Sequence, residues 1–171
     1  LFEALSEIPG VVHVQTFGIK AGIIKTDDQI EGIVLKGVGS DYNWQFFESK
    51  IIEGKLPEID TEKRSNETII SKFTAGKLGL KPGDKLILAF VQDPPRYRSF
   101  TISGIYETGM QDFDELFIFA DVRHIARLNN WDDDQVSGYE ALITDFTRLD
   151  EVTIAVNEVI PYDLLAESIR E

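Results

Sequence analysis

The clearest pattern of hydrophobic and polar positions lies in the central part of the chain, from Lys81 to Asn129. Leu86 to Val91 is almost continuously apolar, which predicts a strand covered on both faces. Arg98 to Thr108 alternates instead, which predicts a second strand with one face in solvent. Between them, Gln92 to Pro95 ends in two prolines that cannot donate ladder hydrogen bonds, so we expect a hairpin with a stiff tip.

The same central part continues into a third strand and a helix. Leu116 to Ala120 reads as a short buried strand, and Asp121 after it is a favourable N-cap residue. The residues that follow place apolar side chains on one helical face, namely Val122, Ile125, Ala126 and Leu128. We therefore expect a strand that leads directly into an amphipathic helix.

The N-terminal part predicts a short helix followed by a hairpin. Apolar residues at helical spacing occupy residues 1–8, and Pro9-Gly10 ends that helix. Strand-like patterns follow over Val11 to Lys25 and Ile30 to Val38, joined by the turn residues Thr26 to Gln29. Two glycines inside the second pattern indicate a bulge or a close approach of another backbone.

A dense aromatic group and a polar loop come next. Residues 41–50 contain Tyr42, Trp44, Phe46 and Phe47. These side chains favour a short helix or turn that fills the core, and a platform for a ligand is the alternative. Glu58 to Asn66 is the most polar run of the chain and has no periodicity, so we expect a loop there.

Beyond this loop, Thr68 to Ile70 predicts a strand, and Ser71 caps a helix that Gly79 closes. Ser137 to Thr144 predicts another strand, and Thr147 with Asp150 has the spacing of a capping box for a last helix that Pro161 ends.

Tyr162 to Ile169 fits either a strand or a helical turn. Strands and helices interleave along the chain without strict βαβ regularity. The sequence therefore predicts an α+β fold with mixed sheets.

Composition narrows the classes of molecule that the chain could bind. The chain has 171 residues, a formal net charge of -13 and no cysteine. Such an acidic chain is disfavoured for nucleic acid and for an anionic membrane surface, whereas a cationic partner or a merely solubilising acidic surface stays open. No run of about 18 apolar residues could span a bilayer. We expect a domain excised from a longer protein.

Candidate chemistry is sparse. His13 and His124 lack ligand-like spacing, so surface or half-buried packing roles are favoured over metal ligation or base catalysis. Gly37 to Gly39 lacks the third glycine of a dinucleotide site. Half of a calcium ligand set is present in Asp112, Asp114 and Glu115. We interpret these residues as a solvated turn, like Asp132 to Asp134. The sequence therefore predicts no catalytic residue, no cofactor site and no metal site, and not an enzyme.

Several stretches resemble one family when taken in order. Ile69 to Asp84 reads I-I-S-x-x-x-A-x-x-L-G-L-x-x-G-D, and Phe100 to Asp114 reads F-x-I-x-G-I-Y-x-T-G-M-x-D-F-D. Ile8 to Val12, Gly32 to Val38 and Glu53 to Pro57 carry I-P-G-V, L-K-G-V and G-x-L-P pieces. This series resembles the extracytoplasmic, MacB-like periplasmic core domain of ABC transporter permeases, nearer to the lipoprotein-releasing (LolC/LolE) branch than to the macrolide exporters.

The resemblance implies two lobes and a place outside the membrane. Residues 1–57 plus 140–171 would form a small α/β, porter-like lobe, and residues 58–139 an inserted strand-rich lobe. Such domains lie between the first two transmembrane helices of a permease, at the periplasmic face of the inner membrane. A second permease subunit and cytoplasmic ATPase subunits would be the partners through the parent protein.

The resemblance also implies a candidate binding element. In the lipoprotein-releasing branch a hairpin hooks a periplasmic lipoprotein carrier. The matching residues here are Pro94, Pro95, Arg96, Tyr97 and Arg98. Their hairpin is short for that hook, and an ordinary exposed tip is the alternative.

Three functions follow as hypotheses. The first is a non-enzymatic permease domain that couples ATP-driven motion to lipoprotein release or substrate export, with hydrophobic spans in the parent sequence just before Leu1 and soon after Glu171. The second is a free-standing soluble extracytoplasmic protein-binding module, which would have polar flanks. The third is a hydrolase that uses scattered carboxylates, which would require a deep pocket with two convergent acids.

Overall fold

The computed structural model describes residues 1–169, and the chain divides into two compact units. Both chain ends, residues 1–15 and the segment from Tyr139 onward, form the smaller unit, and Thr16–Gly138 forms the larger one. The lobes expected from the sequence placed residues 16–57 with the chain ends. In the structure these residues belong to the larger unit, because their strands pair with its central strands.

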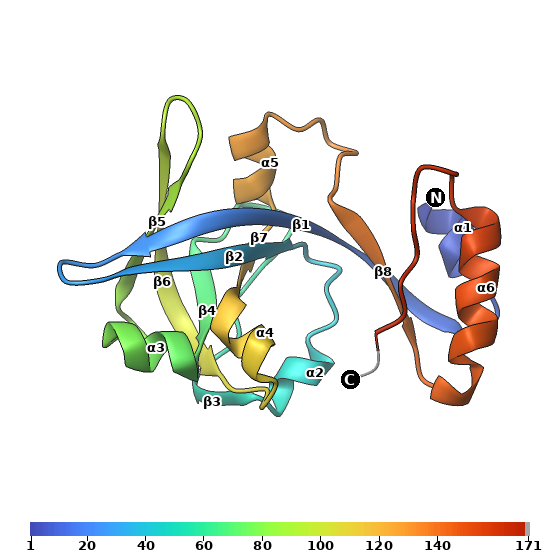
Figure 1. The fold of residues 1–171 in the computed structure, drawn as a ribbon, viewed down its shortest axis with the longest axis horizontal. Helices are drawn as coiled ribbons and strands as arrows, with labels where there is room; N and C mark the ends of the chain where they lie inside the picture. The colour runs from blue at the N-terminus through green and yellow to red at the C-terminus, as the bar shows by residue number, and fades with distance from the viewer. Residues whose placement is uncertain (170–171) are drawn as a thin grey trace. The chain divides into compact units, whose positions relative to one another are not determined.

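The strands of the larger unit follow one another around a closed ring (Figure 1). They are β1 (Val11–Lys25), β2 (Ile30–Val38), β4 (Glu67–Ser71), β5 (Lys85–Phe90), β6 (Arg96–Tyr106) and β7 (Phe117–Asp121). The order β1-β2-β7-β4-β6-β5 returns to β1, with the β2–β7 and β4–β6 pairs parallel and the others antiparallel. The short strand β3 (Ile51–Gly54), which the sequence pattern did not predict, pairs with β6 outside this ring.

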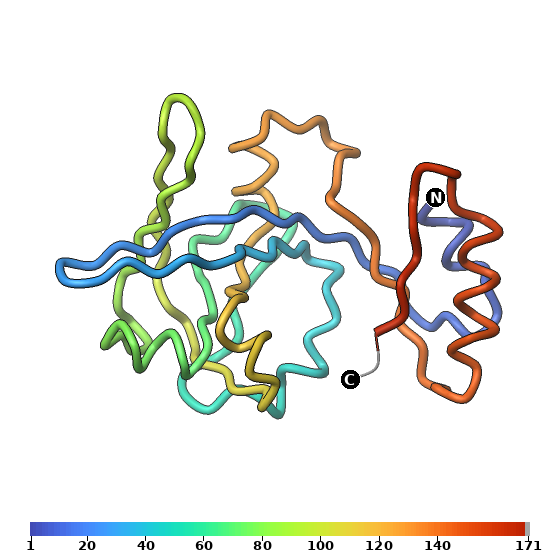
Figure 2. Tube along the Cα trace, viewed as in Figure 1, coloured from blue at the N-terminus to red at the C-terminus, as the bar shows by residue number. Residues whose placement is uncertain are grey.

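The two predicted hairpins are confirmed. The β1–β2 pair runs from Phe17 opposite Val38 to Lys25 opposite Ile30, with the turn at Thr26–Gln29. Figure 2 shows this hairpin as a long extension of the trace. In the second hairpin, Lys85 of β5 lies opposite Thr101 of β6 and Phe90 opposite Arg96.

Four short helices complete the larger unit, and they are α2 (Gln45–Glu48), α3 (Lys72–Leu78), α4 (Gln111–Leu116) and α5 (Arg123–Asn129). The caps of α3 are as predicted, because the Ser71 side chain accepts a hydrogen bond from Thr74 N and Gly79 has a φ of 66°. The N-cap of α5 is Val122 rather than Asp121. The Asp121 carboxylate nevertheless accepts a hydrogen bond from Arg123 N, two residues further on, as an N-cap side chain does.

The middle of the ring is buried on both faces. Ile70 and Ile118 belong to one hydrophobic cluster, while their chain neighbours Ile69 and Phe119 belong to another. Because successive strand residues point to opposite faces, β4 and β7 each lie between two apolar layers. The mixed α+β fold class predicted from the sequence is confirmed.

The faces of β5 and β6 differ from the expected ones. Ile87 in β5 is 53% exposed, so this strand has one solvent face in spite of its apolar sequence. In β6 the solvent face ends at Thr101, and Ser103 and Ile105 are buried. A bulge in the β4–β6 pairing, where Thr68 lies opposite Ile102 and Ile69 opposite Gly104, interrupts the alternation, so Ile105 joins the same hydrophobic cluster as Phe100 and Ile102.

The smaller unit packs helices against the ends of two strands. It contains α1 (Phe2–Ser6), most of β8 (Gly138–Ile143), which pairs with β1, and α6 (Leu149–Val159). Its core consists of Leu5, Ile8, Val14 and Val152.

The predicted capping box at the start of α6 is wrong. The Asp145 carboxylate instead accepts from Thr147 N and caps the short 3₁₀ turn Phe146–Arg148 that precedes the helix. The stretch from Tyr162 to Ile169 forms neither a helix nor a strand. Among residues 1–169, no helix has both the length and the apolar character needed to cross a bilayer.

Candidate functional site

The predicted binding residues lie at the end of the β5–β6 hairpin. Pro94 and Pro95 are in the connection, and Arg96 to Arg98 open β6 opposite Phe90, Ala89 and Leu88. Figure 1 shows this hairpin reaching beyond its neighbouring strands in the larger unit, beside α5. Two large apolar side chains of the hairpin are strongly exposed, Val91 at 87% and Tyr97 at 62%. The tip is therefore available for contact, although its sequence pattern did not single out Val91.

The hairpin presents different chemistry on its two faces. Arg96, Arg98 and Phe100 alternate with Tyr97 and point to the face that α5 covers, where the Phe100 ring lies 4.7 Å from the His124 ring. Arg98 is half-buried there, and its Nη1 donates to Tyr97 O at 2.8 Å. Burial lowers the pKa of Arg98, and three neighbouring cations, Arg64, Arg96 and Arg127, lower it further. This face of the hairpin is thus strongly basic.

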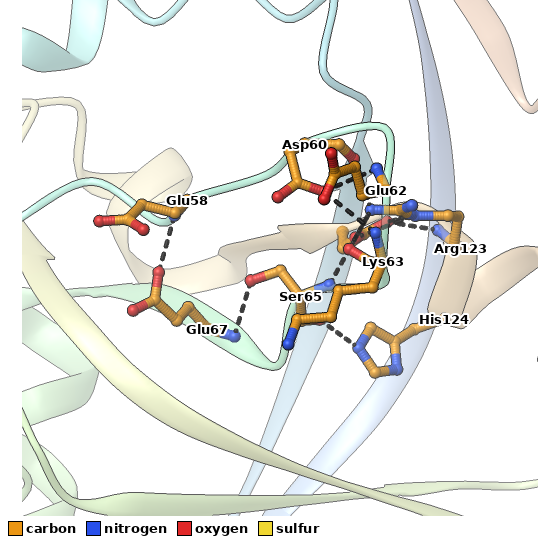
Figure 3. Close-up of polar contacts among 9 residues, drawn as sticks. Glu58, Asp60, Glu62, Lys63, Ser65, Glu67, Arg123 and His124 are labelled. Atoms are coloured by element: carbon orange, nitrogen blue, oxygen red, sulfur yellow. Dashed lines mark hydrogen bonds and ion pairs between the residues drawn. The ribbon is translucent and has the colours of Figure 1, made fainter.

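An ion pair between half-buried Arg123 and buried Asp121 attaches the polar loop to α5 (Figure 3). Arg123 Nη2 lies 2.6 Å from Asp121 Oδ2 and donates to the carbonyl oxygens of Asp60 at 2.7 Å and Lys63 at 2.9 Å. The Asp121 side chain is fully buried and also accepts from Ser65 N at 2.8 Å. The hydrogen bond to Asp121 raises the pKa of Arg123. This network holds the loop from Glu58 to Asn66 in one position.

His124 stands beside this network, inside the core. Its Nε2 lies 2.7 Å from Ser65 O, and because a carbonyl oxygen only accepts, Nε2 carries the hydrogen. Burial lowers the pKa of His124, and the Ser65 carbonyl opposes that shift. The sequence predicted a surface or half-buried packing position for this histidine, whereas its exposed fraction is only 1%. His13 lies far away in the sequence, in the part of β1 that belongs to the smaller unit.

The acidic residues considered for calcium form the unpredicted helix α4. Asp114 is buried rather than solvated, and its carboxylate accepts from Thr108 N at 3.1 Å and Gly109 N at 3.2 Å. Its oxygens therefore hold the turn that precedes the helix. Within residues 1–169 no group of three or more histidine or carboxylate side chains has the arrangement of a metal site.

The aromatic group is part of the core. Trp44 and Phe47 pack against Phe119 with ring centroids 6.2 and 4.8 Å apart, and Tyr42 lies 4.7 Å from Trp44. These edge-to-face contacts join α2 to β7. The interpretation of residues 41–50 as a short helix or turn that fills the core is confirmed, with the helix at Gln45–Glu48.

A surface groove between α3 and α4 contains three carboxylates. It is lined by Lys72, Phe73, Gly76, Glu107, Gly109, Gln111, Asp114 and Glu115. Glu107 pairs with Lys72 at 3.3 Å, Glu115 accepts from the Gln111 side chain at 2.7 Å, and Asp114 holds its turn. Each carboxylate of this groove is therefore already bonded within the fold.

Sequence reasoning missed the residues that complete the basic face. Arg64 comes from the polar loop and Arg127 from α5. The neutral Gln92 beside them lies in the β5–β6 connection, where its Nε2 donates to Leu128 O at 3.5 Å. These residues are separated by about thirty positions along the chain. No local spacing connects them, and only the pairing of the hairpin beneath α5 brings them together.

Comparison with known proteins identifies the fold. No protein-family model matches the sequence, and no curated protein matches it. The extracellular domain of the noncanonic ABC-type transporter YknZ from Gram-positive bacteria is similar over 89% of this chain and 75% of its own, with a TM-score of 0.59 and 14% identity. The periplasmic region of MacB from Actinobacillus actinomycetemcomitans is similar over 92% of this chain and 71% of its own, with a TM-score of 0.56 and 14% identity.

The chain has the fold of an ABC-transporter extracytoplasmic domain. The likeness is one of fold, and it spans both units, because nine-tenths of the chain is matched in each case. The resemblance noted in short stretches of the sequence therefore agrees with the three-dimensional comparison at the level of this general class.

Proposed function

We propose that this chain is the extracytoplasmic domain of an ABC transporter permease, at the periplasmic face of the inner membrane. It carries no reaction of its own and couples ATP-driven motion of the membrane part to lipoprotein release or substrate export. The observation that supports this proposal is the fold shared with the YknZ and MacB domains over about nine-tenths of the chain. A second permease subunit and cytoplasmic ATPase subunits are its partners through the parent protein.

The location can be tested by cysteine labelling, since the chain has no cysteine of its own. Asp28→Cys places one thiol at the exposed tip of the β1–β2 hairpin in the full-length parent protein. A membrane-impermeant maleimide should label it in intact cells whose outer membrane has been permeabilised, and the parent should sediment with membranes. A parent protein in the soluble fraction would instead favour a free-standing binding module.

The finer part of the proposal is that the β5–β6 tip receives a periplasmic lipoprotein carrier. Tyr97 and Val91 offer exposed apolar area, Arg96 adds charge, and two adjacent prolines limit the conformations that binding must order. The change Pro94→Gly with Pro95→Gly should weaken retention of the carrier by the immobilised domain.

Asp27→Gly with Asp28→Gly, at the tip of the other hairpin, is the matched control and should leave retention unchanged. Equal retention of the carrier by the parent domain, the double proline variant and the double aspartate variant would contradict carrier binding at the tip. The labelling experiment would still stand, because it reports on location rather than on the tip.

A further inference from the structure

Three buried polar atoms lack partners in one region of the larger unit. Within residues 1–169 the buried side-chain atoms without a hydrogen-bond partner are Gln92 Oε1, Arg98 Nε and His124 Nδ1. Gln92 contacts the end of α5, Arg98 shares its strand face with Phe100, and the Phe100 ring touches His124. Buried polar groups are normally satisfied, so these three atoms near α5 are hydrogen-bonding groups that a bound molecule could satisfy.

Unpaired positive charge surrounds the same place. Arg64, Arg96 and Arg127 all lie near Arg98, and Arg64 and Arg98 also lie near His124. Among the described residues none of these four arginines forms an ion pair, whereas Lys72 and Arg123 do. In a chain with a net charge of -13, such a basic cluster would attract an anion.

The three unpartnered atoms specify the chemistry of that anion. Arg98 Nε is a donor, whereas Gln92 Oε1 is an acceptor. His124 Nδ1 is also an acceptor in the neutral ring, since Nε2 carries the hydrogen toward Ser65 O. A carboxylate or a sulfate offers only acceptors at neutral pH. Inorganic phosphate near neutral pH retains at least one O–H, and a singly ionised phosphate monoester retains one, so either offers both a donor and acceptors, and guanidinium groups bind its oxygens well.

We propose that a protonated phosphate group binds between α5 and the β5–β6 hairpin. Arg98 Nε donates to one of its oxygens, and its O–H is directed to Gln92 Oε1 or His124 Nδ1. Arg64 and Arg127 flank it, the first half-buried and the second exposed, whereas the three contacting atoms are themselves buried, so their side chains must move to admit the phosphate. This inference uses the larger unit alone and is independent of the transporter proposal.

The proposal is tested by calorimetric titration of the chain at neutral pH with inorganic phosphate, sulfate and acetate. Phosphate should bind saturably to one site, and sulfate and acetate at least about tenfold more weakly, because they leave the acceptors unsatisfied. Equal affinity for sulfate and phosphate, or no saturable binding, would overturn the proposal.

Variants locate the site. Arg98→Gln should lower the phosphate affinity by about tenfold or more, and Arg127→Gln, at an exposed position, should lower it without any risk to the core. Lys25→Gln removes the same charge from the exposed end of β1 and is the matched control. A similar loss in the Lys25 variant would show general charge attraction and overturn the assignment.

Nuclear magnetic resonance of the histidine rings gives a second readout. The chain has two histidines, so the His124 signals are assigned with a His13→Gln variant. Phosphate should shift the His124 Nδ1 resonance along the same saturation curve as the calorimetry. Saturable binding without a change at His124 would overturn the proposed position.

The source of the phosphate group is settled with vesicles. Binding to phosphatidylcholine vesicles that contain phosphatidic acid, with competition by inorganic phosphate, assigns a lipid headgroup. Binding of inorganic phosphate alone assigns a soluble phosphate compound. Failure of both arms overturns the proposal.

Discussion

Gly37 lies where β2 passes the start of α5. A Cβ atom at this position would stand 2.7 Å from Val122 Cα and 2.9 Å from Ile125 Cδ1, so backbone would have to move. Gly32 in the same strand has no atom within 4 Å of its own Cβ position. The sequence predicted a bulge or a close backbone approach from these two glycines, and the structure shows the close approach at Gly37 only.

Gly37→Ala should lower the free energy of unfolding by about 1–3 kcal/mol, because overpacking separates β2 from α5. Gly32→Ala should leave it within about 0.5 kcal/mol of the parent value. Urea unfolding followed by circular dichroism measures both. Similar destabilisation by the two changes would mean that the contact with Val122 is not the cause.

The burial of His124 should make the stability of the chain depend on pH. Its pKa in the folded chain lies below the ordinary value of 6.5, chiefly because of burial. As the pH falls below 6.5, the unfolded chain takes up a proton at this histidine and the folded chain does not. The free energy of unfolding therefore decreases with falling pH until the folded chain is also protonated, at its lower pKa.

His124→Gln should therefore reduce the fall in unfolding free energy between neutral pH and about pH 5. His13→Gln is the matched control and should retain the fall of the parent chain. Urea unfolding at a series of pH values gives the comparison. An unchanged slope in the His124 variant would contradict the assignment.

At the scale of elements, the strands were more predictable than their surroundings. The bounds of β1 and β2 follow from period-two alternation, and the caps of α3 follow from Ser71 and Gly79, because each signal is local. The alternation of β6 was not predictable over its whole length, because a bulge in its pairing with β4, a strand from elsewhere in the chain, shifts the side chains beyond Ile102.

The residues of the site were also only partly predictable, because some of them are far apart in the sequence. The hairpin tip could be located from Pro94 and Pro95, which are adjacent in sequence. Arg64 and Arg127 join Arg98 only through tertiary packing, so no spacing rule could have found them. Helix α4 was missed because its capping interactions come from Asp114 inside the helix rather than from a residue before it.

Asp114 makes α4 and its preceding turn one structural element. Asp114→Ala should lower the free energy of unfolding by about 2–4 kcal/mol, because Thr108 N and Gly109 N lose a charged acceptor in a partly buried site. Asp112→Ala, an exposed change in the same helix, should cost less than about 0.5 kcal/mol. Thermal unfolding distinguishes the two, and equal midpoints would contradict this role.

At the scale of the whole molecule, the net charge of -13 contributes self-repulsion. Added salt screens such repulsion, so the midpoint of thermal unfolding should rise between about 20 and 300 mM sodium chloride. A midpoint that falls with salt would show that specific ion pairs outweigh the excess charge.

A variant tests the same prediction without salt. Asp132, Asp133 and Asp134 are consecutive and exposed, and their replacement by Asn changes the formal charge from -13 to -10. The variant should unfold at a higher temperature at low salt and respond less to added salt, by the same screening argument.

The larger unit begins and ends at one place. Ser137 N donates to Phe17 O at 2.9 Å, and Ile19 N donates to Ser137 Oγ at 2.8 Å. A short glycine linker from residue 138 back to residue 16 would therefore allow a circular permutant, with new termini opened between Asp27 and Asp28. In such a rearranged gene every strand of the ring would keep both of its neighbours, although β2 would become the first strand translated and β1 the last.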